Sequence, residues 1–123
     1  MFCLQLARNY IKGSIPTEIG ELKLLQKIEM EENNLEGTLP SELGRLLFLE
    51  SINFSWNELR GPIPWEFQDF RKLKDLFLKC NAFEVHLPSI MVVWASLENL
   101  VLSLNSFSGE LPAGIEHLSS LGK

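Results

Sequence analysis

The side chains in this sequence that could take part in catalysis or bind a metal are two histidines, two cysteines and a run of carboxylates. His86 and His117 show no H-E-x-x-H spacing and belong to no zinc-type set of cysteines and histidines. Cys80 precedes His86, but the path between them leaves a predicted strand and turns, so a nucleophile and its base would not be held together. Glu31 and Glu32 are adjacent, and neighbouring strand residues point to opposite faces. We therefore predict no catalytic residues, no metal site and no cofactor.

A different polar residue recurs at a fixed interval of 24 residues. Each of these asparagines lies between apolar positions, where a buried amide is costly unless it is hydrogen-bonded. An amide that recurs once per turn of a coil can bond the backbone of the adjoining turns. We expect a structural ladder formed by Asn9, Asn33, Asn57, Asn81 and Asn105.

The same period extends from Met1 to Ser120. Numbering the positions of each repeat as slots 1 to 24, slots 1, 4, 6, 11, 15, 19 and 22 are always apolar, and proline always occupies slot 16. At the apolar content of 46%, random filling of these positions would have a probability on the order of 10⁻¹². The pattern predicts a solenoid with repeats 1–24, 25–48, 49–72, 73–96 and 97–120, and with 121–123 beginning a sixth.

Alternation within each repeat predicts the elements of one turn. Leu4 and Leu6 face inward while their neighbours face solvent, and the same pattern recurs in every repeat, which predicts a parallel inner sheet. The later apolar slots favour a turn at Gly-x-Ile-Pro and a short helical or 3-10 return path. The fold class is thus an α/β solenoid with an irregular or 3-10 outer face. Glycine at slot 13 favours unusual backbone angles, and Val85 in that slot predicts a locally different fourth turn.

Composition excludes several classes of partner. The formal net charge of −5 argues against nucleic acid, which is bound by concentrated Lys and Arg. The longest apolar run, Ile90–Trp94, is too short to span a membrane. Cys3 and Cys80 lie three repeats apart, which is too far for a disulfide. Excess negative charge in the second and fifth repeats favours a basic partner.

Ligand specificity must come from the variable slots of the sheet, because the leucines and asparagines are committed to the fold. The second repeat is acidic there and the next two are aromatic, which suits a peptide with one basic and one apolar residue. Alternatively, the aromatic residues stack across strands and the glutamates form a solvated face. The candidate ligand-binding residues are Glu29, Glu31, Glu32, Asn53, Ser55, Trp56, Phe77 and Lys79.

Two further features have open interpretations. Asn53-Phe54-Ser55 is an N-glycosylation acceptor triplet, although the repeat pattern generates such triplets by itself. A glycan on Asn53 would compete with a ligand for the middle of the inner face. In the fourth repeat, Ile90, Val92 and Val93 fall outside the apolar slots, so they form either a surface patch or a repacked turn.

The Gly-x-(Ile/Leu)-Pro turn is the most specific marker in the chain, occurring at residues 13–16, 37–40, 61–64 and 109–112. Together with the period, it resembles the plant-type leucine-rich repeats of receptor-like kinases, receptor-like proteins and polygalacturonase-inhibiting proteins. The resemblance covers essentially the whole chain. It implies a right-handed superhelix whose inner strand face recognises peptides, hormones, co-receptors or pathogen proteins.

Members of this family normally carry cysteine-paired caps, a membrane span and often a kinase, none of which occurs in this sequence. The resemblance implies an internal fragment, or a truncated product, of a receptor ectodomain on the extracellular side of the plasma membrane. We therefore expect a recognition module that binds a peptide or protein ligand, or a co-receptor, and not an enzyme. The alternatives are a secreted or intracellular inhibitor or scaffold without a kinase, and a fragment that folds poorly and binds nothing.

Overall fold

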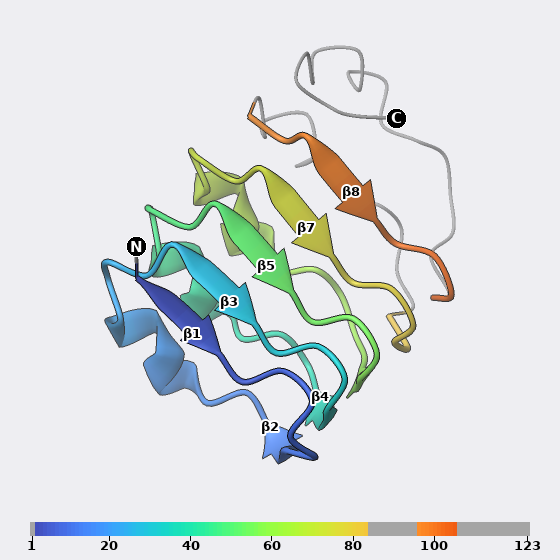
Figure 1. Cartoon of the computed structure of the whole chain (residues 1–123). Helices are drawn as coiled ribbons and strands as arrows, with labels where there is room; N and C mark the ends of the chain where they lie inside the picture. The colour runs from blue at the N-terminus through green and yellow to red at the C-terminus, as the bar shows by residue number, and fades with distance from the viewer. Residues whose placement is uncertain (1, 84–95, 106–123) are drawn as a thin grey trace.

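The computed structural model describes residues 2–83 and 96–105, and its main feature is a parallel sheet of five short strands (Figure 1). Each strand pairs with the next at a shift of one repeat, so that Leu4 lies opposite Ile28 and Ile28 opposite Ile52. The predicted parallel inner sheet is therefore confirmed. Its strands are β1 (Cys3–Gln5), β3 (Lys27–Glu29), β5 (Ser51–Asn53), β7 (Asp75–Phe77) and β8 (Asn99–Val101).

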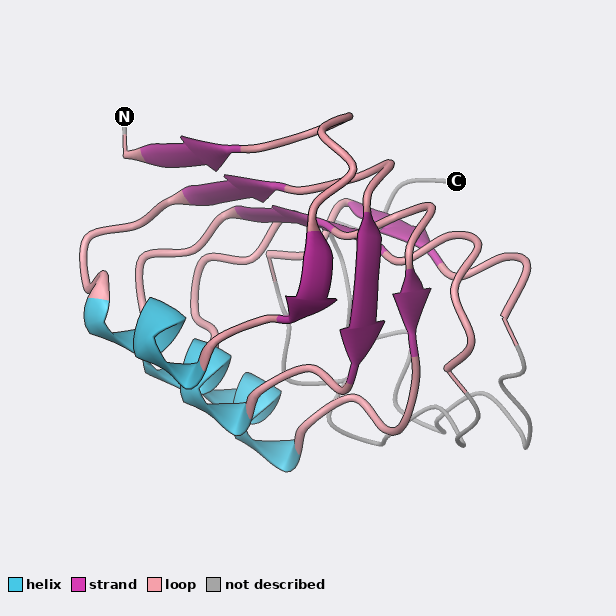
Figure 2. Ribbon diagram, turned by 90° about the horizontal axis from the view of Figure 1, so that it is seen from below, coloured by secondary structure: helices cyan, strands magenta, loops and turns pink. Residues whose placement is uncertain are grey.

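Two other layers complete each turn of the coil. A second parallel sheet contains β2 (Lys12–Ser14), β4 (Asn34–Gly37) and β6 (Glu58–Leu59). Three 3-10 helices, η1 (Thr17–Glu21), η2 (Ser41–Arg45) and η3 (Trp65–Asp69), stack along another side (Figure 2). The sequence predicts the 3-10 return path but not the second sheet, because slots 10 to 14, which contain its strands, show no sustained alternation and the strands pair only through the stacking of turns.

The core consists of side chains from the apolar slots. The second and third repeats each have seven such residues, and all fourteen are buried. The first turn differs, because it packs against a neighbouring turn on one side only: Leu22 is 49% exposed, whereas Leu46 and Phe70 in the same slot are 0% and 1% exposed. Full burial of such a side chain stabilises the fold by about 2 kcal/mol, so the middle turns carry most of the hydrophobic stabilisation.

The asparagines join successive turns. The Asn57 Oδ1 atom accepts a bond from the Leu35 N–H at 3.0 Å, and its Nδ2 atom donates to the carbonyls of Met30 and Phe54 at 3.0 and 2.9 Å. The side chains of Asn33, Asn81 and Asn105 repeat this arrangement. These amides satisfy backbone groups that the strands leave unpaired, and so they stabilise the stack.

Glycine is required at two kinds of position. At slot 13, Gly37 and Gly61 have φ of 81° and 84°, which is the unusual backbone conformation expected for the turn. At slot 20, a Cβ atom on Gly44 would lie 2.5 Å from the Glu66 carbonyl oxygen. The absence of a side chain there allows η2 and η3 to approach each other closely.

Some sequence predictions lie outside the described residues. They concern the fourth turn at Val85, the apolar set Ile90, Val92 and Val93, the turn at 109–112, the residues His86 and His117, and the segment 121–123.

Candidate functional site

The candidate residues lie at the carboxyl ends of the three middle strands of the five-stranded sheet, β3, β5 and β7, and in the segments that follow them. We call this surface the open sheet face. In the first four turns the ladder continues beyond the strand, since the slot 8 N–H donates to the slot 7 carbonyl of the next turn, as Glu32 N does to Ser55 O at 2.9 Å. Slot 8 adopts a left-handed backbone, with φ between 57° and 60°, at Arg8, Glu32, Trp56, Cys80 and Leu104.

This left-handed conformation is unusual, because it costs a residue other than glycine about 1–2 kcal/mol. The backbone bonds between turns offset that cost. As a result, slot 8 side chains of any type project at the same point of every turn, and four of the five are exposed. The sequence does not reveal this geometry, because no glycine or asparagine marks slot 8.

The three candidate glutamates of the second turn have different surroundings. Glu29 accepts a hydrogen bond from the Gln5 side chain, and a carboxylate oxygen of Glu29 lies 3.1 Å from the Lys27 ammonium. The hydrogen bond between Lys27 and Glu29, together with their charge attraction, raises the pKa of Lys27. Glu32 pairs with Arg8 at 3.1 Å, with both side chains largely exposed, so this ion pair contributes little stability.

Glu31 is the exception. Its Oε1 atom is buried and has no hydrogen-bond partner in the part of the chain that the structure describes. A buried carboxylate oxygen without a partner is costly, and a donor that reached it would recover that free energy. Glu31 is therefore the glutamate with an acceptor still to offer.

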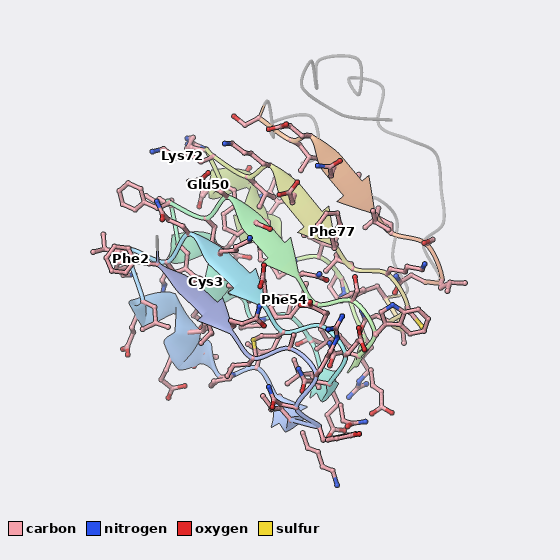
Figure 3. All side chains as sticks on the ribbon, in the orientation of Figure 1. Phe2, Cys3, Glu50, Phe54, Lys72 and Phe77 are labelled. Atoms are coloured by element: carbon pink, nitrogen blue, oxygen red, sulfur yellow. The ribbon has the colours of Figure 1, made fainter. Side chains whose placement is uncertain are left out.

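The aromatic candidates lie one and two turns further on. Trp56 is 49% exposed, and the Lys79 ammonium lies 5.7 Å from its ring centroid in a cation–π contact. Phe77 belongs to β7 and is half-buried, although sequence analysis expected it to stand outward like Trp56 (Figure 3). Trp56 is thus the larger apolar surface for a partner.

Two of the smaller candidates have internal partners. Ser55 is 7% exposed and its hydroxyl accepts a bond from the Lys79 N–H at 3.1 Å, so it offers little surface to a ligand. The Asn53 side-chain oxygen accepts a bond from the Ser55 N–H at 3.0 Å. Asn53 lies between Glu29 and Phe77 in the strand register, in the middle of the sheet.

A crevice of about 150 Å³ lies at the amino ends of the middle strands, away from the open sheet face, and is lined by Lys27, Ser51 and Asp75 among others. Sites for small molecules are usually about 300–1,000 Å³, so this crevice is small for such a ligand.

Residues 2–83 and 96–105 contain neither a candidate metal site nor a candidate membrane span. Within these ranges no group of three or more His, Cys, Asp or Glu side chains is arranged to hold a metal ion. No helix in the same ranges has the length and apolarity needed to cross a membrane. Cys3 and Cys80 are both free thiols.

Comparison with known proteins agrees with the geometry. The family model for the Leucine Rich Repeat matches residues 24–46, 48–70 and 96–118, which is more than half of the chain. A search of curated protein sequences finds no match.

Solved structures are similar over nearly the whole chain. The plant peptide hormone receptor RGFR1, in complex with RGF2, is 39% identical with a TM-score of 0.95 over 98% of this chain. The ectodomain of GASSHO1/SCHENGEN3 from Arabidopsis thaliana, in complex with CASPARIAN STRIP INTEGRITY FACTOR 2, is 33% identical with a TM-score of 0.95 over 98%. The Arabidopsis receptor kinase HAESA, in complex with the peptide hormone IDA and the co-receptor SERK1, is 30% identical with a TM-score of 0.94 over 98%.

This chain spans 19%, 14% and 20% of the lengths of those three proteins. The matched repeats, the parallel sheet and the close structural similarity confirm the fold class predicted from the sequence. The chain belongs to the leucine-rich repeat family, in the plant type found in receptor-kinase ectodomains.

Proposed function

We propose that this chain is a recognition module of a cell-surface receptor of the receptor-kinase type, and that it binds a peptide or protein ligand on its open sheet face. It acts by binding and not by catalysis. The observation that carries the proposal is the contrast between Glu31, with its unpartnered buried oxygen, and the exposed Trp56. The ligand-bound ectodomains to which the chain is similar support the same role.

The surroundings of the site define the chemistry of the ligand. Glu31 accepts a hydrogen bond from a ligand ammonium or guanidinium group, whereas Glu29 and Glu32 are already engaged by Lys27 and Arg8. Trp56 provides a rigid apolar surface for a neighbouring ligand side chain. The ligand therefore has a basic residue close to an apolar one.

The spacing of the slots adds a second charged contact. Glu31 and Lys79 occupy slot 7 two turns apart, and at about 4.8 Å between strands their backbones are separated by about 10 Å. An extended peptide covers that distance in about three residues. A ligand carboxylate about three residues from the basic side chain lies near the Lys79 ammonium, which is in contact with the Trp56 ring.

The test is a selection from a displayed library of random peptides on the intact chain, with counter-selection against the Glu31→Lys/Trp56→Ala double variant. Enriched peptides should carry a basic residue near an apolar one. Each single substitution should weaken their binding about tenfold or more, because loss of an interface anchor costs about 2 kcal/mol. Trp56 is exposed and Glu31 is half-buried, so circular dichroism of each variant should be used to check that the fold is unchanged.

Glu32→Lys is the matched control, because Glu32 carries the same charge but is paired with Arg8. It should weaken binding less than Glu31→Lys does. Peptides that bind the wild-type chain and the double variant equally would refute the proposed site.

A further inference from the structure

A second surface lies at the opposite ends of the strands from the open sheet face. The loops that lead from the 3-10 helices into β3, β5 and β7 contain slots 23 and 24 of each turn. All six residues in these slots are exposed, and we call them the flank strip: Lys23, Leu24, Leu47, Phe48, Arg71 and Lys72. We infer that the flank strip binds an apolar, acidic segment of a protein partner.

The apolar residues of the strip are exposed to an unusual degree. Leu24, Leu47 and Phe48 are 56%, 50% and 44% exposed. The exposure of Leu22 arises because its turn has a neighbour on one side only, but Leu47 and Phe48 lie between the second and third turns, with described turns on both sides. A contiguous group of large apolar side chains in water marks an interaction surface.

The strip is ordered by its backbone. The Lys23 N–H donates to the Glu21 carbonyl at 2.9 Å, and the Leu47 N–H donates to the Arg45 carbonyl at 3.1 Å, so these two successive turns have the same local conformation. Leu24 and Phe48 therefore stack at one position of the coil.

Charge selects the chemistry of the partner. Three of the six residues are cations and none is a carboxylate, although the chain as a whole has a net charge of −5. The Lys72 ammonium lies 5.2 Å from the centroid of the Phe48 ring. Of the nearby carboxylates, Glu50 is paired with Lys74 at 3.4 Å.

The order of the residues along the strip is also informative. Lys23 and Leu24 lie in the first turn, Leu47 and Phe48 in the second, and Arg71 and Lys72 in the third, so cations occupy both ends of the strip and the middle is apolar. Three turns span about 10 Å, or about three to four residues of an extended chain. The complementary segment has one or two large apolar side chains with acidic residues on both sides.

The experiment uses the intact chain labelled with ¹⁵N and a synthetic peptide, acetyl-DELFDE-amide, titrated at low ionic strength and followed by amide chemical shifts. Two peptides serve as comparisons: acetyl-DESSDE-amide keeps the charge without the apolar residues, and acetyl-KKLFKK-amide reverses the charge. We expect saturable shifts at residues 23–24, 47–48 and 71–72 with the first peptide only. Phe48→Ser and Arg71→Glu/Lys72→Glu should each weaken binding about tenfold, as expected for loss of an interface anchor.

Trp65→Ser is the control variant, because Trp65 is 61% exposed on η3 and lies outside the strip. It should leave binding unchanged. Absence of saturable shifts, equal binding of DELFDE and DESSDE, or shifts insensitive to both strip variants would each overturn the inference. Two further outcomes would assign the strip to another occupant and also overturn it: a dimer in sedimentation velocity that Phe48→Ser abolishes, or binding to phosphatidylserine vesicles without peptide binding.

Discussion

The asparagine ladder gives the most quantitative prediction, through substitution of Asn57 by alanine. Asn57 is buried, and its side chain joins the second and third turns through one accepted bond, from the Leu35 N–H, and donated bonds to Met30, Phe54 and Ser55 at 3.0, 2.9 and 3.3 Å. A hydrogen bond contributes about 1 kcal/mol net, and a buried group left unpaired costs about 1–3 kcal/mol. Asn57→Ala should therefore lower the free energy of unfolding by about 3–4 kcal/mol.

Asn9 provides the matched control. It occupies the same slot in the first turn but is exposed, and within the described residues its side chain makes one hydrogen bond, donated to the carbonyl of Ala7 at 2.9 Å. Asn9→Ala should cost less than about 1 kcal/mol, since it removes a single solvent-accessible bond. Urea denaturation of the intact chain, followed by far-ultraviolet circular dichroism, measures both values.

A third variant separates hydrogen bonding from shape. Asn57→Asp keeps the size and the acceptor but replaces the donor with an oxygen that faces the carbonyls of Met30, Phe54 and Ser55. At neutral pH it should be at least as destabilising as Asn57→Ala. Similar losses for Asn9→Ala and Asn57→Ala, or a loss below about 1 kcal/mol for Asn57→Asp, would refute the role of the ladder.

Other predictions concern packing, backbone geometry and modification. Leu46→Ala should cost about 2–5 kcal/mol in urea denaturation, and Leu22→Ala in the same slot should cost far less, because the two residues are 0% and 49% exposed; equal costs would contradict this view of the core. Gly44→Ala should lower the melting temperature more than Gly13→Ala does, since a Cβ on Gly44 would lie 2.5 Å from a backbone oxygen of the next turn, whereas Gly13 has only its φ of 89° against substitution; the reverse order would contradict it. In a chain made through the secretory pathway, we expect the wild-type protein to be heavier than the Asn53→Gln variant by the mass of a glycan. We also expect the variant to bind a selected peptide more tightly than the wild-type protein does. Identical masses would refute modification at Asn53.

Much of the scaffold could be predicted because the same apolar, asparagine and proline positions recur in every repeat. Leu25, Ile28 and Met30 are buried as the apolar slots indicate. Hydrogen bonds from Asn33 reach the backbone of its own turn and of the preceding one. A signal repeated five times outweighs the ambiguity of a single strand or turn.

The geometry of the candidate site could be predicted only in part. Glu29, Glu31 and Glu32 look alike in the sequence, and only their contacts show which one has an acceptor to spare. The left-handed backbone at Trp56 is imposed by bonds between turns, such as Trp56 N to Lys79 O at 2.8 Å, and not by the residue type. Local propensity therefore carries no signal for it.

The burial of Ser55 shows a related limit. Alternation in the sequence placed it on the solvent side, yet it is 7% exposed. The Ser55 hydroxyl accepts a hydrogen bond from the Lys79 N–H of the next turn. Such contacts between turns are not visible in the pattern of one repeat.

The central claim is that the open sheet face binds the ligand, and hydrogen exchange of the intact chain, with and without a selected peptide, tests it most directly. The account predicts that bound peptide slows exchange of amides at residues 29–32, 53–56 and 77–80, while η1, η2 and η3 exchange as before. Slowed exchange confined to the 3-10 helices or to the second sheet, with residues 29–32 and 53–56 unchanged, would contradict it.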